Sequence, residues 1–416
     1  MKKTLADINV KGKKVLVRVD YNVPLNASLQ ITNDKRIAAT LPTIEYLLKK
    51  NAAVILMSHL GRPKGKVVSE MSLKPISVCL SELLGKPVKF VGGDCISAES
   101  KKVAADLKSG EILLLENLRF HPEEEGKNAA GEKVKASMDV FAKELASMGE
   151  IFVQDAFGTV HRAHASTASI VKYVKDAAVG FLVEKELKFL GETIEKPARP
   201  FLAILGGAKV SDKINVIENL LNKVDAILIG GAMAYTFLKS QGVSAGTSLV
   251  EDDKLELADE LLKKAKEKKV DFLLPVDHII TNKVDFVNKQ VPSDADIKAT
   301  VDEAISEGYM GVDVGPQSLE KFSEVVKFSK TIVWNGPLGI FEIDEFSKGT
   351  IKIAELVAEA TDDGAISVIG GGDSVSAVKK AGADKRISHI STGGGASLEF
   401  LEGKELPGIA ALSDKK

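Results

Sequence analysis

The sequence predicts an α/β protein with two doubly wound, Rossmann-like domains, each a parallel sheet in a three-layer αβα arrangement. Short runs rich in Val, Ile and Leu recur along the chain without alternation, as in parallel strands covered on both faces. Amphipathic helical patterns separate these runs, and strand–helix alternation is typical of parallel sheets. With 416 residues, the chain is long enough for about two or three domains.

The predicted strands are apolar runs that end in Gly, Pro, Asn or Asp. In the first half they are Lys14–Val19, Ala53–Ser58, Val88–Val91, Ile112–Glu116 and Ile151–Asp155. In the second half they are Leu202–Gly206, Ala226–Gly230, Asp271–Pro275, Thr331–Trp334 and Ala365–Gly370. Helical patterns lie between them, over Lys35–Lys50, Lys133–Met148, Asp252–Lys268 and Ser318–Ser329.

A domain boundary is predicted near residues 180–200. Gly180 precedes an amphipathic helical stretch over Phe181–Ile194, and Pro197 and Pro200 end this stretch before the next strand. We therefore expect an N-terminal domain over 1–180, a connecting helix over 181–196 and a second domain from 197.

Composition excludes several classes of protein. The formal net charge of −2 gives no basic excess for binding nucleic acid or an acidic membrane. Cys79 and Cys95 form neither a disulfide framework nor a CxxC pair. No apolar run reaches membrane-spanning length, and the N-terminus does not resemble a signal peptide, so we expect a soluble, cytoplasmic protein.

Arginine is scarce and unevenly placed. Of 56 basic residues only seven are arginine, and five of these precede residue 163: Arg18, Arg36, Arg62, Arg119 and Arg162; the others are Arg199 and Arg386. A planar guanidinium suits bidentate contacts with carboxylate or phosphate, which suggests an anion site in the first half. Ordinary salt bridging is the alternative.

In the first half, polar residues follow the predicted strands. Asp20 and Asn22 follow one strand, His59 and Arg62 the next, Arg119 a third, and His161, Arg162 and His164 a fourth. Ligands of doubly wound sheets bind beyond the carboxyl ends of the strands. This convergence favours the anion site over scattered salt bridges.

In the second half, glycine takes that position. Clusters occur at 206–207, 230–231, 336, 370–372 and 393–395. Glycine lets backbone N–H groups approach a phosphate closely, and a helix that starts there adds favourable partial charge. Asp373, inside one cluster, suits Mg²⁺ coordination or helix capping. The Walker A loop, the GxGxxG fingerprint and the HRD sequence of protein kinases are all missing.

Taken together, these segments resemble the phosphoglycerate kinase family. Arg18–Pro24, Ser58–Pro63 and Gly158–His164 resemble motifs of its N-terminal domain. Gly206–Lys213, Trp334–Pro337, Gly370–Asp373 and Ser391–Gly395 resemble motifs of its C-terminal domain. The motifs follow the family's order over nearly the whole chain.

The resemblance implies a monomeric enzyme whose two domains face a hinged cleft. The N-terminal domain would bind 3-phosphoglycerate, the domain over 197–390 would bind Mg²⁺ with ATP or ADP, and the segment 391–416 would pack back toward the N-terminal domain. The implied reaction is reversible, in-line phosphoryl transfer between 1,3-bisphosphoglycerate and ADP, in glycolysis, after domain closure.

The resemblance also implies roles for individual residues. Substrate would be held by Asp20, Asn22, Arg36, His59, Arg62, Arg119 and Arg162. Nucleotide would be bound by Gly207, Ala208, Lys209, Lys213, Gly231, Val312, Asn335, Pro337, Glu342, Gly371, Gly372, Asp373 and Ser374, with Asp373 on the metal. The implied catalytic set is Arg36, Lys209, Gly372 and Gly395. Arg18 is expected to brace Asp20 or the C-terminal tail.

The sequence departs from the family pattern at a few positions. Tyr21 stands where Phe is usual, Tyr309 where Trp is common and Ser374 where Thr is common. Val284 stands where the family often has Phe beside the adenine, so base selectivity stays open.

Phosphoryl transfer between these groups needs neither a protein nucleophile nor a general base. We therefore expect His59 to hydrogen-bond substrate, and His161 and His164 to be structural. Two other functions fit a two-domain α/β chain. An NAD-dependent dehydrogenase normally carries GxGxxG, and a two-domain anion-binding protein without catalysis would not need Lys209 and Asp373.

Overall fold

The computed structural model describes residues 2–127, 132–133 and 135–415, which divide into two compact units. The N-terminal unit comprises residues 1–187 and 405–416, and the C-terminal unit comprises 188–404. The first division therefore falls inside the predicted connecting helix. The predicted tail segment 391–416 divides as well, because 391–404 belongs to the C-terminal unit.

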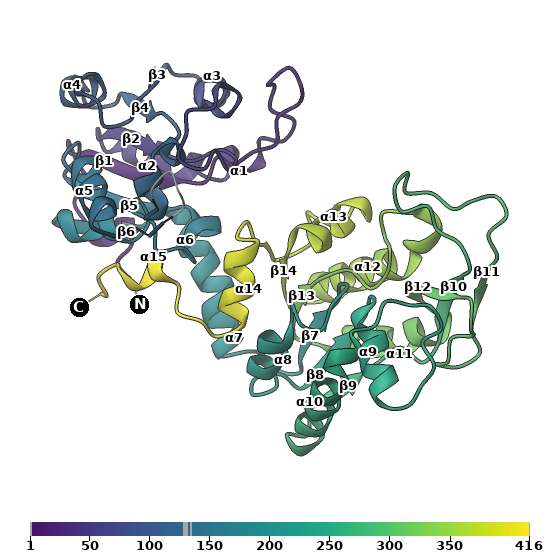
Figure 1. Ribbon diagram of the computed structural model, residues 1–416. Coiled ribbons are helices and arrows are strands. Elements are labelled where there is room, and N and C mark those ends of the chain that lie inside the picture. The colour runs from purple at the N-terminus through teal and green to yellow at the C-terminus, as the bar shows by residue number, and fades with distance from the viewer. Residues whose placement is uncertain (1, 128–131, 134, 416) are drawn as a thin grey trace. The chain divides into compact units, whose positions relative to one another are not determined.

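The N-terminal unit is built on a parallel six-stranded sheet with strand order β3-β4-β2-β1-β5-β6 (Figure 1). The strands are β1 (Lys14–Val19), β2 (Ala53–Met57), β3 (Val88–Val91), β4 (Ile112–Leu115), β5 (Ile151–Asp155) and β6 (Asp176–Val179). The first five match the predicted strands within one residue. β6 was not predicted, because its Asp-Ala-Ala-Val sequence has little apolar signal.

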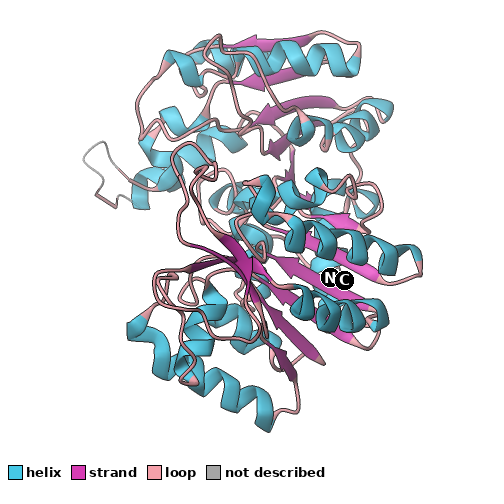
Figure 2. Ribbon diagram, turned by 90° about the vertical axis from the view of Figure 1, so that its right-hand side faces the viewer, coloured by secondary structure: helices cyan, strands magenta, loops and turns pink. Residues whose placement is uncertain are grey.

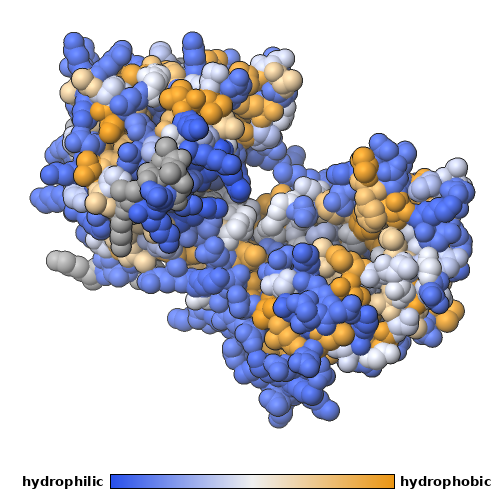
Figure 3. All heavy atoms as spheres, in the orientation of Figure 1, coloured by the Kyte–Doolittle hydropathy of each residue, from blue (hydrophilic) through white to orange (hydrophobic). Residues whose placement is uncertain are grey.

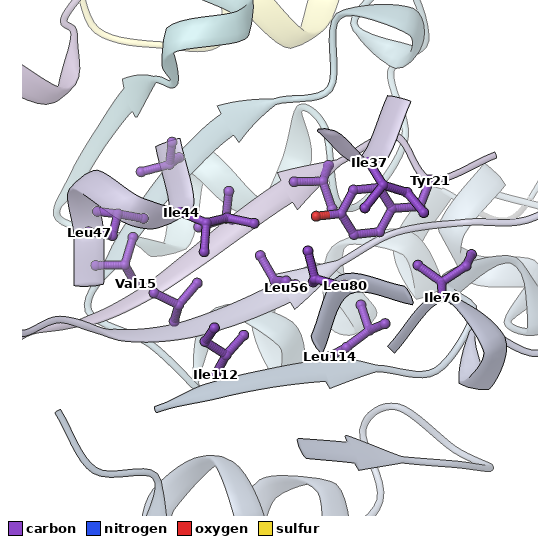
Figure 4. Close-up of a cluster of buried hydrophobic side chains, with 14 of the residues drawn as sticks. Val15, Tyr21, Ile37, Ile44, Leu47, Leu56, Ile76, Leu80, Ile112 and Leu114 are labelled. Carbon is purple, nitrogen blue, oxygen red and sulfur yellow. The ribbon is translucent and has the colours of Figure 1, made fainter. Parts of the chain in front are cut away.

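Alternation of side chains along each strand builds a core on both faces of this sheet. Val15, Val17 and Val19 of β1 face a cluster that also contains residues of α2 and α3 (Figure 4). Arg18 projects from the opposite face, where it is fully buried. A charged side chain in that position requires partners, which are described below.

The helices of this unit are α1 (Lys35–Ala38), α2 (Leu41–Lys49), α3 (Lys74–Leu84), α4 (Ala98–Asp106), α5 (Lys135–Ala146), α6 (Phe181–Glu186) and α15 (Pro407–Ala410). The helix predicted over 35–50 is two helices. Pro42 lies in the first turn of α2, where its missing N–H is tolerated; in the interior of one longer helix it would remove a hydrogen bond. Residue 134, within the predicted helix over 133–148, lies outside the described residues.

The connecting helix predicted over 181–196 is not one regular α-helix. After α6 the chain forms a π-helical segment over Leu187–Glu192 and then α7 (Thr193–Glu195). The start of α6 is capped by Asp155, whose Oδ1 accepts hydrogen bonds from the Leu182 and Val183 amides at 3.0 and 3.3 Å. A Cβ on Gly180 would lie 2.3 Å from the same Oδ1, so only glycine allows this approach.

The C-terminal unit contains a second parallel six-stranded sheet, with strand order β15-β14-β13-β7-β8-β9. Its strands are β7 (Phe201–Leu205), β8 (Ala226–Ile229), β9 (Asp271–Leu273), β13 (Thr331–Asn335), β14 (Ile366–Gly370) and β15 (His389–Ile390). The two sheets confirm the predicted fold class. A small antiparallel sheet, β11-β10-β12, was not predicted; it comprises β10 (His278–Thr281), β11 (Ile297–Ala299) and β12 (Met310–Val314).

Helices flank the strands of this unit (Figure 2). They are α8 (Ile214–Leu220), α9 (Met233–Ser240), α10 (Leu255–Glu267), α11 (Pro316–Phe328), α12 (Lys348–Asp362), α13 (Gly372–Lys380) and α14 (Gly395–Leu401). Figure 3 shows a hydrophilic surface over α10, whose lysines and glutamates face solvent while Ala258, Leu261 and Ala265 are buried.

Both ends of the chain join the N-terminal unit. The Lys3 amide donates to Ser413 O at 3.1 Å, and Lys2 Nζ donates to Leu412 O at 2.7 Å. The Gly408 amide donates to Val160 O at 2.8 Å, which ties α15 to the loop after β5. Within the described ranges, no helix is both long and apolar enough to cross a membrane.

Candidate active site

The polar segments of the N-terminal unit meet at one edge of its sheet. β1, β2, β4 and β5 are neighbours and run parallel, with Arg18 beside Met57 and Val19 beside Asp155. Their carboxyl ends therefore lie at the same edge. We call the residues that follow these strands the arginine edge: Asp20, Asn22, Arg36, His59, Arg62, Arg119 and Arg162.

Three of these residues form a connected group. Arg36 NH1 lies 3.2 Å from Asp20 Oδ2 and donates to Asn22 O at 3.0 Å. Asn22 Oδ1 accepts from the Gly61 amide at 2.9 Å, which links this group to the loop after β2. The side chain of Arg36 remains 37% exposed, so its guanidinium is accessible to a ligand.

The other arginines carry excess positive charge. Arg62 and Arg162 are exposed, and within the described part of the chain neither guanidinium has a hydrogen bond or an ion pair. Arg119 is largely buried; its NH1 donates to Gly61 O at 2.9 Å. Its Nε lies 3.2 Å from Glu125 Oε1, close enough for an ion pair but not aligned for a hydrogen bond. Only part of this positive charge is balanced locally.

A buried network lies behind the arginine edge, and no pattern in the sequence predicts it. Arg18 Nε donates to Ser166 Oγ at 2.8 Å, and Arg18 NH2 lies 3.9 Å from Glu124 Oε1. Glu124 also accepts from the Ser166 amide at 3.0 Å and from Ser166 Oγ at 2.5 Å. We expected Arg18 to brace Asp20 or the tail, but its contacts among the described residues are with Glu124, Ser166, His59 and, through NH1, the carbonyl oxygen of Val19. Glu124 lies in a run of three glutamates that reads as a solvated surface segment.

His59 is held neutral by this network. Arg18 NH2 lies 3.3 Å from His59 Nδ1, and both residues are buried. Burial lowers the pKa of His59 well below 6.5, and the nearby charges of Arg18 and Arg119 add to the effect. Since the guanidinium can only donate, Nδ1 accepts and the ring proton is on Nε2. Asp20 Oδ1, 3.9 Å from Nδ1, is too distant to compete.

His164 belongs to the same buried region. Burial, followed by the charges of Arg119 and Arg18, lowers the pKa of His164 to about 3. Its Nδ1 lies 3.8 Å from Glu124 Oε1 and has no hydrogen-bond partner among the described residues. Its amide donates to Thr167 Oγ1 at 3.0 Å, as a structural residue of the loop would.

In the C-terminal unit, glycine-rich loops meet at the carboxyl edge of the second sheet. Asn335 at the end of β13 pairs with Leu205 on one side and Gly370 on the other, and Leu205 pairs with Ile229. The loops that follow these four strands are therefore neighbours. We call them the glycine edge: 206–213, 230–231, 336–342 and 371–374.

Two of these loops are in backbone contact. A Cβ on Gly206 would lie 2.0 Å from Pro337 O, and a Cβ on Gly336 would lie 2.1 Å from Gly206 O. Gly336 also has φ +104°, which favours glycine. The Gly231 amide donates to Leu338 O at 2.9 Å, so the third loop joins the same layer.

Polar side chains extend over this layer. Lys213 Nζ donates to Asn335 Oδ1, and burial lowers the pKa of Lys213 against the opposing charges of Asp212 and Asp373. The Gly336 amide donates to Ser374 Oγ at 2.5 Å. Lys209 and Ala208 are exposed on the first loop.

Asp373 has a free carboxylate. It is exposed in the first turn of α13, with no hydrogen bond or ion pair to any described residue. The N-cap of α13 is Gly371, with φ +86°, and no side chain caps the helix. Asp373 therefore does not cap this helix, and its carboxylate is available to a divalent cation.

An apolar cluster lies beside the loop 336–342. Val312 of β12 is buried with Ile343 and Phe346, and Val284 packs against them. The Ile340 amide donates to Val312 O at 2.8 Å, which ties the loop to the small sheet. Glu342 is exposed near the end of this loop. Gly395 begins α14 after Gly394, which has φ +50°.

Known proteins are similar in sequence to this chain over nearly its whole length. The phosphoglycerate kinase family model matches residues 5–404. A phosphoglycerate kinase of Chlorobium phaeobacteroides is 57% identical over 413 residues, covering 99% of this chain and 100% of that protein. One of Clostridium botulinum is 54% identical over 415 residues, covering 100% of this chain and 99% of that protein.

Solved structures agree with the sequence comparisons. The structure of phosphoglycerate kinase from Coxiella burnetii is 40% identical, with a TM-score of 0.87, and covers 99% of this chain and 98% of its own. That of phosphoglycerate kinase from Pyrococcus horikoshii is 31% identical, with a TM-score of 0.79 and the same coverage.

Proposed function

The chain belongs to the phosphoglycerate kinase family, and we propose that its arginine edge binds 3-phosphoglycerate while its glycine edge binds ATP or ADP. It is an enzyme, a phosphotransferase with a carboxyl group as acceptor. The family's reaction moves a phosphoryl group between the acyl phosphate of 1,3-bisphosphoglycerate and ADP, reversibly.

The charge of the arginine edge supports binding of 3-phosphoglycerate there. A ligand with one phosphate and one carboxylate requires several cationic donors, and Arg62 and Arg162 have no acidic partner among the described residues. Neutral His59 adds an Nε2–H donor. Asp20 and Asn22 orient Arg36, whose exposed guanidinium we assign to the reacting end of the substrate.

The backbone of the glycine edge supports nucleotide binding. Gly207, Gly371 and Gly372 leave backbone N–H groups open to a polyphosphate, and Lys213 and Asn335 lie over the same layer. We place the nucleoside against Gly231, Val312 and Pro337, with Glu342 at the ribose. Ala208 and Ser374 complete this set.

We propose Asp373 as the protein ligand of Mg²⁺. When bound with the nucleotide, the metal would neutralise phosphate charge. One protein carboxylate suffices, because Mg²⁺ commonly keeps phosphate oxygens and water as its other ligands.

Charge stabilisation is the catalytic task in this proposal. In-line transfer places negative charge on the equatorial oxygens of the phosphoryl group. We assign Lys209 and Arg36 to that charge, with N–H groups of Gly372 and Gly395 as further donors. Neither attacking oxygen must lose a proton, so no general base is assigned. Since the two sets belong to different units, we propose that domain closure during the reaction brings the substrates together.

The single observation that carries this proposal is that Arg62 and Arg162, at the edge that also holds Arg36 and Arg119, have no acidic partner among the residues the structure describes. A coupled assay tests it: ATP- and Mg²⁺-dependent consumption of 3-phosphoglycerate, read through a dehydrogenase. Lys209→Ala serves as the inactive variant and Lys266→Ala, an exposed lysine of α10, as its matched control. Folded protein that binds both ligands without turnover would instead favour the non-catalytic binding protein.

We further propose that the enzyme acts as a monomer in the cytoplasm, on small-molecule substrates alone, because its family reaction belongs to glycolysis. Base selectivity is proposed to depend on Val284 and Val312, which form the apolar surface next to the loop 336–342.

A further inference from the structure

Two loops outside both proposed substrate sites bring three different metal-binding side chains together. Asp94 and Cys95 follow β3, and His121 follows the 3₁₀ turn Leu118–Phe120 after β4. One carboxylate oxygen, the Cys95 Sγ and one His121 ring nitrogen all lie within 4.8 Å of one another. Among the residues that the structure describes, no other group of three such side chains is this close.

Both loops are held in place by other contacts. Asp94 Oδ1 accepts from the Ile96 amide at 2.8 Å, and Asp94 O accepts from Ser100 Oγ at 2.7 Å. The His121 ring stacks on Phe141 with centroids 4.7 Å apart, and its Nε2 lies 3.2 Å from Asp94 Oδ1. Asp94 and His121 are therefore held near each other, and Cys95 is fully buried next to Asp94 in the chain.

We propose that Asp94, Cys95 and His121 bind a divalent cation of the zinc type, with water at the fourth position. Thiolate, imidazole and carboxylate are the three side-chain ligands that Zn²⁺ uses. Bond lengths of about 2.0–2.3 Å in a tetrahedral site put ligand atoms roughly 3.3–3.8 Å apart. The present separations, up to 4.8 Å, need a contraction of about 1 Å, within the reach of side-chain rotation.

The surroundings of the three groups suit a cation. The His121 ring packs on Phe141 and directs Nε2 toward Asp94, and Cys95 is fully buried. Binding replaces the S–H bond of Cys95 with a metal–sulfur bond and releases the proton to solvent. The half-exposed Asp94 carboxylate gives the ion a path inward.

The site is independent of the proposed phosphoryl transfer, but it adjoins the arginine edge. His121 lies two residues after Arg119, and Glu124 follows three residues later. A bound cation would tie this segment to the loop between β3 and α4. We therefore expect cation binding to stabilise the N-terminal unit against unfolding.

Cobalt titration of the full chain tests the proposal directly. Co²⁺ replaces Zn²⁺ in such sites, and a cobalt–thiolate bond has a charge-transfer absorption that oxygen ligands do not produce. In a buffer that contains a reductant without affinity for metal, we expect each chain to bind one Co²⁺ ion with this absorption. Adding Zn²⁺ should displace the Co²⁺ and remove the absorption. Cys95→Ser should abolish the band. Cys79→Ser removes the only other cysteine and should keep it, as should Asp373→Asn.

Two further variants test the other ligands. Asp94→Asn and His121→Gln should each weaken Co²⁺ binding by about 10- to 100-fold or more. If Cys95→Ser does not fold, thiol labelling of the Cys79→Ser protein replaces it, and Zn²⁺ should slow modification of Cys95. A folded wild-type chain without the absorption, a band that survives in Cys95→Ser, or labelling unaffected by Zn²⁺ overturns the proposal.

Discussion

Arg18 NH2 lies 3.3 Å from His59 Nδ1, and both side chains are buried. The guanidinium cannot accept a hydrogen bond, so this contact selects the neutral tautomer that carries its proton on Nε2. The Arg18 side chain is held in turn by Ser166 and Glu124. A buried ion pair thus determines which ring nitrogen the arginine edge offers to a ligand.

The His59 ring should stay neutral across the neutral pH range. Because burial and neighbouring arginines hold its pKa well below 6.5, we expect no titration of its ring between about pH 6 and 8. Nuclear magnetic resonance of the histidine rings, with His59→Gln to assign the signal, measures this. A midpoint near pH 6.5 for His59 would contradict the described hydrogen bond.

Lys209→Ala should reduce kcat by orders of magnitude with little change in either KM. Lys209 is exposed on the glycine edge, and in our proposal its charge acts on the phosphoryl group during transfer. Steady-state kinetics with both substrates varied gives the answer, with Lys266→Ala as control. A change confined to KM would show that Lys209 only binds nucleotide.

Arg62→Ala should raise the KM for 3-phosphoglycerate by about 10- to 100-fold, as expected for the loss of a charge-assisted contact, and leave the KM for ATP nearly unchanged. Arg386→Ala is a suitable control, because Arg386 is paired with Asp362 in the other unit. Equal weakening of both substrates would refute the assignment of the two edges.

Two glycines of the glycine edge should respond in opposite ways to alanine. A Cβ on Gly336 would lie 2.1 Å from Gly206 O at φ +104°, so Gly336→Ala should cost about 3 kcal/mol or more, or prevent folding. A Cβ on Gly372 meets no atom within 4 Å. Gly372→Ala should fold with unchanged or higher stability.

The same Gly372→Ala chain should lose activity, because its methyl group would lie where we place the nucleotide phosphates. We expect kcat or nucleotide affinity to fall by about tenfold or more, measured beside urea unfolding of the same preparation. Full activity in a stable Gly372→Ala protein would remove Gly372 from the proposed site.

Asp155 should make stability depend on pH. Burial raises its pKa to about 7 in the folded chain, against hydrogen bonds from Thr43 and the α6 backbone. In the unfolded chain its pKa is about 3.9, so between these values the folded state binds more protons. Stability from this group is therefore present at low pH and is lost as pH rises toward about 7.

Asp155→Asn isolates that contribution. It should remove from the wild-type curve a loss of about 4 kcal/mol spread over pH 3 to 8, of which about 2.5 kcal/mol falls between pH 5 and 8. Buried histidines such as His164, with pKa about 3, act in the opposite sense, and their effect cancels in the comparison of the two proteins. Urea unfolding followed by circular dichroism measures the difference. Parallel curves for both proteins would contradict a protonated Asp155.

The sequence predicted the two parallel sheets because their strands are continuous apolar runs. The runs Val15–Val19 and Ile332–Trp334 are typical of strands in a parallel sheet, because the side chains on both faces of the strand are buried. β11 could not be found in this way, because it has three residues and all are exposed. β10 and β12 are largely buried, but polar residues or glycine interrupt their apolar runs, as Gly311 and Asp313 do in β12. Register and turn geometry there depend on tertiary contacts.

The candidate site was predictable only where residue type indicated it. Arginines and glycines at strand ends are visible in the sequence, and the structure gathers them at two sheet edges. The roles of Glu124 and Ser166 could not be predicted, because a run of glutamates and a serine in a loop are typical of exposed surface segments. Their burial follows from Arg18, which needs a counter-charge on its face of the sheet.

Residues 412–414 lie beside Lys2 and Lys3, which has a consequence for how the chain is made. In the sequence, the two parts of the N-terminal unit are separated by the 217 residues of the C-terminal unit, 188–404. Because α15 follows residues 188–404, the N-terminal unit cannot be completed during synthesis until the C-terminal unit has been translated. Joining residue 416 to residue 1 by a short peptide and opening the chain between the units would make each domain continuous. The paired ends, with Lys2 beside Asp414, make this circular permutation geometrically simple.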